Sequence, residues 1–139
     1  MMKRFRSARG QSLLEFSLIL MVMFFIGVAA LDLGRVFFAT IVITNASREG
    51  ARYLTLHPDD STTTFSGTKA AAVAEAQGSM VDLTASNVTT TYCLLADALP
   101  GCDKGFPVEV TVNYDFQLST SIFFPSTLPL SRSTRMLVP

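Results

Sequence analysis

The sequence predicts an α+β fold in which one long N-terminal helix, partly in a membrane, carries a small head. From Phe16 to Leu31 no charged residue occurs, and only Ser17 and Gly27 interrupt the apolar side chains. Pro58 is the first proline, so nothing breaks a helix before it. Beyond Pro58, β-branched and aromatic residues alternate with polar ones over strand-length segments, which predicts a sheet with one covered face.

The chain divides into four expected segments, which leave room for one soluble domain within its 139 residues. We expect a cytoplasmic leader (1–10), the transmembrane part of the helix (11–31), its extramembrane continuation (32–57) and the head (58–139). The leader contains no acid and four basic residues: Lys3, Arg4, Arg6 and Arg9. By the positive-inside rule the N-terminus stays in the cytoplasm, and the head lies across the membrane.

We expect the helix to run from about Ser12 to about Leu56. The apolar run is about as long as the roughly 20 residues that span a bilayer, and a helical period continues beyond it. At about 1.5 Å per residue, such a helix is roughly 65–70 Å long, about twice the hydrocarbon thickness. Its outer half should offer the head an apolar stripe of residues near a 3.6 period: Phe38, Ile41 or Val42, Ala46 and Tyr53.

The head is expected to contain one short helix and an antiparallel sheet of three or four strands. A polar connection (58–67) leads into an alanine-rich helix from Thr68 to Met80, which ends near Gly78. Three later segments have the composition of strands: Asn87–Leu95, Pro107–Leu118 and Ser131–Val138. The segment from Ala98 to Gly105 is expected to be a loop, and Pro125 and Pro129 break the apolar stretch before the last strand.

The middle strand is the clearest of the three because its side chains alternate without interruption. Its apolar face consists of Val108, Val110, Val112, Tyr114 and Phe116. Its polar face consists of Glu109, Thr111, Asn113 and Asp115. This pattern predicts a strand with one face on the core and the other in water.

Glu15 is the one carboxylate within the segment that would cross the membrane. A charge there is costly unless it finds a partner, so Glu15 points to a function. It lies four residues beyond Gln11, which follows Gly10 at the end of the basic leader. A peptidase that cuts after Gly10 would create an amine on Gln11, with a pKa near 8 in water. The amine of a neighbouring subunit could then pair with Glu15; alternatively, Glu15 only reaches back to the cytoplasmic interface.

The combination of a basic leader ending in glycine, a glutamate five residues after the cleavable bond and an unbroken apolar helix resembles type IV prepilins and pseudopilins. Three stretches are similar to the TadE-like family, the minor pseudopilins of tight-adherence (Flp) pilus systems: Arg9-Gly10-Gln11-Ser12-Leu13-Leu14-Glu15-Phe16, Leu31-Asp32-Leu33-Gly34-Arg35-Val36-Phe37 and Asn45-Ala46-Ser47-Arg48-Glu49-Gly50-Ala51-Arg52-Tyr53. Phe16 stands where the major pilins usually carry tyrosine, and the chain is far longer than those pilins. Both points favour a minor subunit.

The resemblance implies a pilin-like fold and a subunit that a prepilin peptidase cleaves after Gly10. The helix would then assemble into a type IV or Tad pilus, or into its initiating complex, with Glu15 setting the register between subunits. The implied partners are other pilin and pseudopilin subunits, an inner-membrane assembly platform and the lipid bilayer. The protein would be a single-pass bacterial inner-membrane protein that reaches the cell surface after assembly, where the fibre supports adhesion, secretion or DNA uptake.

Two other functions remain open from the sequence. Val28-Ala29-Ala30 fits the small-residue pattern of ordinary signal peptidase, and cleavage after Ala30 would release a secreted binding module. The chain could also remain in the membrane as a secretion or assembly component that never enters a fibre. Direct nucleic-acid binding is not expected, because beyond the leader the chain carries eleven acidic residues against seven basic ones.

Small residues and a charge pair mark further assembly candidates on the helix. Gly27, Ala30 and Gly34 are three and four residues apart, so they share a helix face on which another helix could approach closely in lipid. Asp32 and Arg35 are three residues apart and can pair at the outer membrane border. That pair either closes the membrane span within one chain or contacts a neighbouring subunit.

The two cysteines, Cys93 and Cys102, enclose a short loop and are expected to form a disulfide in an oxidising compartment. On the loop-entropy account, this bond stabilises the head by roughly 2–3 kcal/mol. Catalysis has little support, because His57 is the only histidine and no serine elbow or phosphate-binding glycine loop occurs. We expect no enzyme activity, no metal and no cofactor. Asp59 and Asp60 are expected in a solvated turn.

Overall fold

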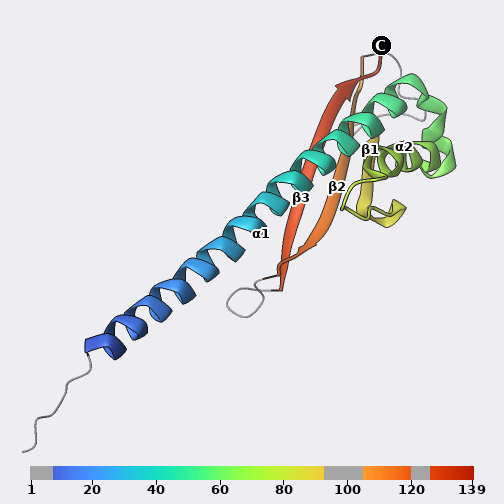
Figure 1. The fold of residues 1–139 in the computed structure, drawn as a ribbon. Helices are drawn as coiled ribbons and strands as arrows, with labels where there is room; N and C mark the ends of the chain where they lie inside the picture. Colours follow the sequence, from blue (N-terminus) through green and yellow to red (C-terminus); the bar gives the residue numbers. More distant parts are fainter. Residues whose placement is uncertain (1–7, 93–104, 120–125) are drawn as a thin grey trace, which may run out of the picture.

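The structure, a computed structural model, describes residues 8–92, 105–119 and 126–139. Figure 1 shows a long helix, α1, whose far half carries a head made of a second helix and a sheet. The principal elements are α1 (Ala8–Leu56), α2 (Ser66–Ala76), β1 (Val88–Tyr92), β2 (Pro107–Gln117) and β3 (Thr127–Leu137). Two 3-10 turns, η1 (Pro58–Thr63) and η2 (Ala85–Asn87), connect them. The α+β, pilin-like architecture predicted from the sequence is therefore confirmed.

Helix α1 continues without a break for 49 residues, from the apolar segment into the head. It ends at Leu56, as predicted, because His57 leaves the helical conformation at φ −129° and Pro58 starts the next turn. The described helix begins at Ala8, four residues before the expected Ser12, so it includes the Gly10–Gln11 bond.

The three strands form an antiparallel sheet in the order β1-β2-β3. The predicted alternation in β2 is confirmed: Val108, Val110 and Val112 are fully buried, and Phe116 is 6% exposed. By rise per residue β2 is about 34 Å long, and α1 from Asp32 to Leu56 is about 36 Å. The sheet can therefore follow the outer half of the helix along nearly its whole length (Figure 1).

The last strand begins at Thr127, four residues earlier than predicted, and so it contains Pro129. Pro129 lies opposite Asp115 of β2 in the register. In the described sheet β3 pairs only with β2, and an edge strand tolerates a residue without an N–H group. The predicted break at Pro129 was wrong for this reason. The first strand is described only to Tyr92, and the predicted continuation to Leu95 and the loop up to residue 104 lie outside the described residues.

The core forms where α1 meets β2 and α2, and small residues of α1 allow the close approach. Ala39, Ala46, Ala51 and the larger Ile43 and Leu54 are all buried on this side of the helix. A Cβ atom built on Gly50 would lie 3.2 Å from Val110 Cγ1 and 3.3 Å from Ala72 Cβ. Since these contacts are already tight, Gly50 sets the spacing between the helix and the head.

The predicted contact stripe on α1 was only partly correct. Ala46 is buried as expected, Val42 packs partly buried against the core and Tyr53 is half-buried. Phe38, however, is 43% exposed, and Ile41, the alternative to Val42, is 58% exposed. The outer half of α1 carries apolar residues on two faces, so the largest side chains indicated the wrong face. The head packs instead on the face that carries the smaller residues, where the backbones can come closer.

Hydrogen bonds of polar side chains help to hold the two helices and the sheet together. Asp60 accepts hydrogen bonds from Gly67 N (3.0 Å), Thr68 N (2.7 Å) and Thr68 Oγ1 (2.6 Å) at the start of α2. Because Phe65, at the N-cap position, makes no side-chain cap, Asp60 supplies the cap from the preceding turn. In the core, the hydroxyl oxygens of Ser47 on α1 and Thr134 on β3 lie 2.7 Å apart. Asp60 thus has a structural role that differs from the expected solvated turn.

Replacing Asp60 by alanine should lower the free energy of unfolding by about 1–2 kcal/mol, because two backbone N–H groups and one hydroxyl at the start of α2 lose their acceptor. Thermal and denaturant unfolding of the full chain in detergent measure this change. The matched control is Asp115→Ala on the exposed face of β2, which should change stability by less than about 0.5 kcal/mol. Equal effects for the two variants would contradict the capping role.

Glu109 on the outer face of β2 gives the head a measurable dependence on pH. Its carboxylate accepts hydrogen bonds from Ser133 Oγ and, at 3.0 Å, from Arg135 Nε. The hydrogen bond from Ser133 and then the pairing with Arg135 hold the pKa of Glu109 below its ordinary value of 4.5. A lowered pKa in the folded chain means that this stabilisation is present above about pH 4.5 and is lost as the pH falls further.

The variant Glu109→Gln should therefore be less stable than the parent chain at neutral pH, and this difference should shrink as the pH is lowered from about 5 to 3. Chemical denaturation at a series of pH values measures it. A difference that stays constant, or grows, below pH 4.5 would show that Glu109 does not titrate as described. Because the pair is on the surface, high salt should also reduce the difference.

Candidate assembly segment of the N-terminal helix

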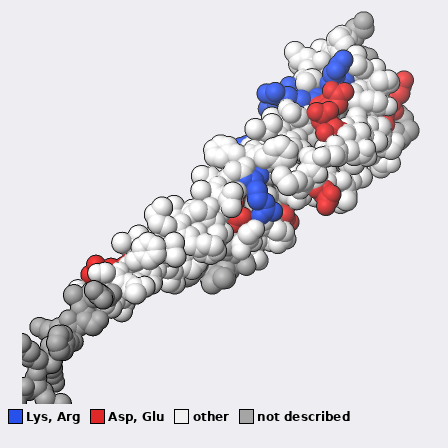
Figure 2. All heavy atoms as spheres, in the orientation of Figure 1, with Lys and Arg blue, Asp and Glu red and all other residues white. Residues whose placement is uncertain are grey.

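The first half of α1 has an apolar surface that the head does not cover. Its large side chains from Leu13 to Ile26 are 37–68% exposed. Figure 2 shows this part of the molecule as a long surface with charge only near its lower end and at its junction with the head. The segment Gly10–Leu56 contains a stretch long and apolar enough to cross a membrane, and none of that stretch is buried inside the chain. The helix fits a single-pass membrane anchor.

The predicted processing residues and Glu15 lie within two turns of each other at the start of this surface. Gly10 and Gln11 are exposed within α1, and residues 1–7 before it lie outside the described residues. Gln11 Nε2 donates a hydrogen bond to Glu15 Oε1 at the long distance of 3.4 Å. The side chains at positions 11 and 15 therefore share a helix face, as their spacing of four residues requires.

Phe16 is 62% exposed beside Glu15. Ser17, the one hydroxyl in the apolar run, donates a hydrogen bond to Leu13 O at 2.8 Å, so its polar group does not need water. Glu15 is thus the conspicuous polar group on this part of the helix surface. An ionised carboxylate cannot be satisfied by its own helix in the same way, because it has no proton to donate to a backbone carbonyl.

The three small residues Gly27, Ala30 and Gly34 are all exposed. A Cβ atom built on Gly27 or Gly34 would meet no atom within 4 Å. The head therefore does not account for these glycines, in contrast to Gly50. Their common face remains available to another helix.

Asp32 and Arg35 form a pair that joins α1 to the lower end of the sheet. Arg35 Nη1 lies 3.1 Å from Asp32 Oδ1 and 2.7 Å from Ser119 Oγ. The guanidinium carbon lies 5.1 Å from the centre of the Phe116 ring, in cation–π geometry. Asp32 is only 4% exposed, whereas the Arg35 side chain remains 45% exposed. The expected pair therefore exists within one chain, and any contact with a neighbouring subunit would involve the exposed side of Arg35.

Sequence reasoning did not identify Phe116 and Ser119 as partners of Arg35. Phe116 was predicted as an apolar core residue, which is correct, and Ser119 follows the strand with no distinguishing pattern. Ser119 is 84 residues from Arg35 in the sequence, so only the fold brings them together. The expected disulfide cannot be placed in this way, because Cys93 and Cys102 lie outside the described residues.

Other polar side chains have local structural partners. The ring of His57 stacks on that of Tyr53, with centroids 4.3 Å apart, and Nδ1 lies 3.2 Å from Tyr53 O. Among the described residues, no group of three or more His, Cys, Asp or Glu side chains could hold a metal ion. His57 thus lies at the end of α1, next to the turn that leads to α2.

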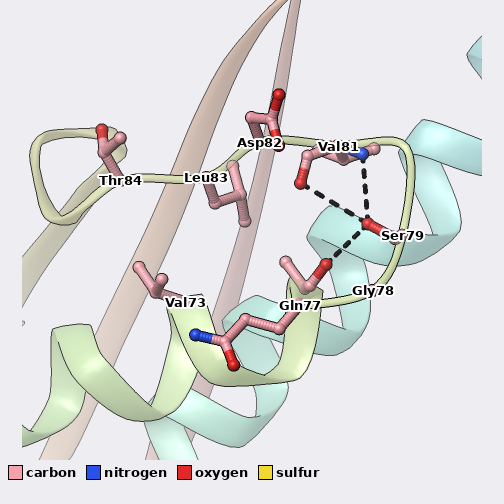
Figure 3. A pocket seen from close by; sticks show the side chains of 9 residues that line it. Val73, Gln77, Gly78, Ser79, Val81, Asp82, Leu83 and Thr84 are labelled. Carbon is pink, nitrogen blue, oxygen red and sulfur yellow. Dashed lines mark hydrogen bonds between the residues drawn. The ribbon is translucent and has the colours of Figure 1, made fainter.

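A pocket of about 390 Å³ lies between the end of α2 and the following loop. Figure 3 shows Val73, Gln77 and Leu83 around it, and the Ser79 hydroxyl bonding to nearby backbone groups. Ser79 Oγ donates to Ala76 O at 2.7 Å and accepts from Val81 N at 3.1 Å, so it is engaged in holding the loop. The pocket contains no cluster of titratable groups and is on the head, away from the helix surface described above.

Comparison with known proteins supports the resemblance seen in the sequence. Residues 10–52 match the family described as TadE-like protein. The matched segment begins at the predicted cleavage position and includes Glu15, the three small residues and the Asp32–Arg35 pair. No curated protein and no solved structure matches the chain. The TadE-like resemblance is therefore confirmed over this segment, and the family suggests a pilin-like protein associated with Tad pili.

Replacing Arg35 by alanine should lower the free energy of unfolding of the head by about 1–3 kcal/mol, because the nearly buried carboxylate of Asp32 loses its guanidinium partner. The matched control is Arg52→Ala, since Arg52 lies 3.7 Å from Glu49 in a pair with the same i,i+3 spacing but with both side chains well exposed. That change should cost less than about 0.5 kcal/mol. Thermal unfolding in detergent compares the two variants, and equal losses would contradict a structural role for Arg35.

Proposed function

We propose that this protein is a minor pilin-like (pseudopilin) subunit that is cleaved by a prepilin peptidase after Gly10. Its N-terminal helix would then assemble into a Tad or type IV pilus, or into the complex that initiates one. The observation that carries the proposal is Glu15: a carboxylate on an exposed apolar helix, one turn from the residue that would become the new N-terminus. The TadE-like match over residues 10–52 supports the same assignment.

The proposed mechanism depends on the cost of an isolated charge in lipid. A carboxylate within the membrane is stabilised when it meets a positive group, and the Gln11 amine of a neighbouring subunit would supply one. Within the described residues Glu15 has only the long hydrogen bond from Gln11, which leaves most of its acceptor capacity free. Pairing between subunits would fix the axial position of one helix relative to the next.

The face containing Gly27, Ala30 and Gly34 would contribute close packing between helices. Apolar side chains gain little by leaving lipid for another apolar surface, so association in a membrane depends on fit and on polar contacts. The open space around both glycines is consistent with such a partner surface. The proposed partners are therefore other pilin or pseudopilin subunits and the inner-membrane assembly platform, with the N-terminus in the cytoplasm and the head outside.

Cleavage after Ala30 fits this architecture less well than cleavage after Gly10. Helix α1 passes through Ala30 without a break, and Asp32 and Arg35 immediately beyond it are tied to the head. Signal peptidase acts on a short apolar segment followed by a cleavage site, whereas here the helix continues. Retention of the helix also preserves the segment that matches the TadE-like family.

The central test is replacement of Glu15 by alanine, with Glu15→Gln as a variant that removes only the charge. We expect incorporation into sheared pili to fall at least about tenfold in both, which corresponds to the loss of about 1.4 kcal/mol of pairing energy. Cleavage should continue, so sequencing of the mature N-terminus should give Gln11 in the parent chain and in both variants. Immunoblotting of sheared filaments and membranes measures the distribution of the protein. Glu49→Ala, on the extramembrane part of the helix, is the control and should be incorporated normally.

Normal incorporation of Glu15→Ala would refute the proposed register mechanism. A mature N-terminus at Leu31 would refute the whole assignment, because the anchor would be lost. A chain that is cleaved at Gln11 but never leaves with sheared filaments would instead be a permanent membrane component of the assembly machinery.

A further inference from the structure

The outward face of α1 stays apolar beyond Leu31, where the head already covers the opposite face. Phe37 is 64% exposed, Phe38 43% and Ile41 58%. The next exposed residues on this face, at helical spacing, are Asn45 and Arg48. Figure 2 likewise shows uncharged surface continuing past the charged group midway along the molecule. The apolar surface of the anchor therefore extends about three turns further than the uncharged run in the sequence.

Of the two charged residues within this extension, Asp32 is buried, and Arg35, whose side chain is 45% exposed, is paired with it. Asp32 is 4% exposed beneath the head, and Arg35 is held by Asp32, Ser119 and the Phe116 ring. Neutralisation by a near partner reduces the cost of bringing both charges close to lipid. A hydropathy profile would end the membrane span at Asp32, because it does not include the pairing of Asp32 with Arg35 within the chain.

The length of the apolar face agrees with the full thickness of a bilayer. From Leu13 to Ile41 the helix rises about 42 Å at 1.5 Å per residue. A bilayer is about 40–45 Å thick with its headgroup regions, and its hydrocarbon core is about 30 Å. Counted from Glu15 at the inner edge of the hydrocarbon core, roughly 20 residues reach about Val36. Phe37, Phe38 and Ile41 then coincide with the outer headgroup region.

We propose that the outer surface of the bilayer meets the unassembled subunit at Phe37, Phe38 and Ile41, and not at Leu31. These three side chains lie among the lipid headgroups and the adjoining ends of the acyl chains, where amphipathic helices place their apolar faces. The end of the head that carries Ser119 and Phe116 therefore rests against the membrane. This inference rests on the membrane anchorage in the proposed function, and it is independent of cleavage at Gly10 and of fibre assembly.

The structure favours lipid over a second copy of the chain as the occupant of this face. The three residues continue, without a polar interruption on that side, the exposed surface of the segment that fits a membrane span. Along the helix axis, these residues also lie at the depth where the outer headgroup region is expected. A contact with a second copy has no comparable support among the described residues, and it is treated as a distinct outcome of the test.

Tryptophan scanning can measure the depth of each position, because the chain contains no tryptophan and each variant has a single reporter. The variants are Phe24→Trp within the anchor, Phe37→Trp and Ile41→Trp on the proposed interfacial face, and Asn45→Trp one turn beyond. Each full chain is reconstituted into phosphatidylethanolamine–phosphatidylglycerol vesicles. Quenching by phospholipids brominated on their acyl chains detects lipid contact, and quenching by iodide detects exposure to water. Circular dichroism establishes that each variant retains its helix and sheet.

We expect brominated lipid to quench the tryptophans at positions 24, 37 and 41, with the strongest effect at 37 and 41 from bromine nearest the headgroup. Iodide quenching at 37 and 41 should be several-fold weaker than at 45, and emission should be shifted to shorter wavelength. If iodide quenches positions 37 and 41 as strongly as position 45 while brominated lipid quenches position 24, the inference is overturned and the membrane anchorage stands. Protection from iodide without quenching by lipid would also overturn it, because a protein would then cover this face. Failure of lipid to quench position 24 would refute both the inference and the membrane anchorage.

Discussion

The close packing of α1 on the head depends on small residues along one face of the helix. At Gly50 the backbone of α1 comes so near that an added Cβ would lie within 3.3 Å of both Val110 and Ala72. Ala39, Ala46 and Ala51 lie on the same side of the helix and are buried. β2 contributes the fully buried Val108, Val110 and Val112 to this interface, and α1 contributes Ile43 and Leu54 between its small residues. Most of the other large apolar side chains of α1 are left on the outside, and this arrangement lets one helix serve both in the core of the head and as an anchor.

The same arrangement explains how much of the fold the sequence could predict. The alternation of valines in β2 and the absence of proline before residue 58 specify a strand and a helix directly, and both were predicted correctly. The contact face of α1 was predicted only in part, because Phe38 and Ile41 are more hydrophobic than Ala46 and Gly50 and yet remain outside. Hydrophobicity measures a preference to avoid water, whereas the helix–sheet spacing depends on side-chain volume.

The candidate site was predictable in its local parts only. Gly10, Gln11 and Glu15 are close in sequence, and the spacing of three residues between Asp32 and Arg35 predicts their pairing. The contacts of Arg35 with Phe116 and Ser119 arise because β2 runs along the helix and ends beside residue 35. Asp60 likewise could not be recognised as the cap of α2, since it is separated from Thr68 by a turn whose Thr64 and Phe65 both have positive φ angles. Such conformations are uncommon for residues other than glycine, so the sequence does not indicate the turn.

Of the three acidic residues of α1, two pair with an arginine of the same helix, and Glu15 does not among the described residues. Asp32 pairs with Arg35, and Glu49 lies 3.7 Å from Arg52, each within a single helical turn. Glu15 has no cation among the described residues within such a distance, and it lies on the part of the helix with the most exposed apolar surface. Because apolar surface alone gives helices little reason to associate in lipid, a specific stagger between subunits requires a polar or closely fitting contact. In the proposed assembly, Glu15 and the face of Gly27, Ala30 and Gly34 supply those contacts in the membrane. Phe37 and Ile41, at the edge of the bilayer, are still partly in contact with water, so their burial by a neighbouring subunit would add a hydrophobic gain that the deeper residues cannot provide.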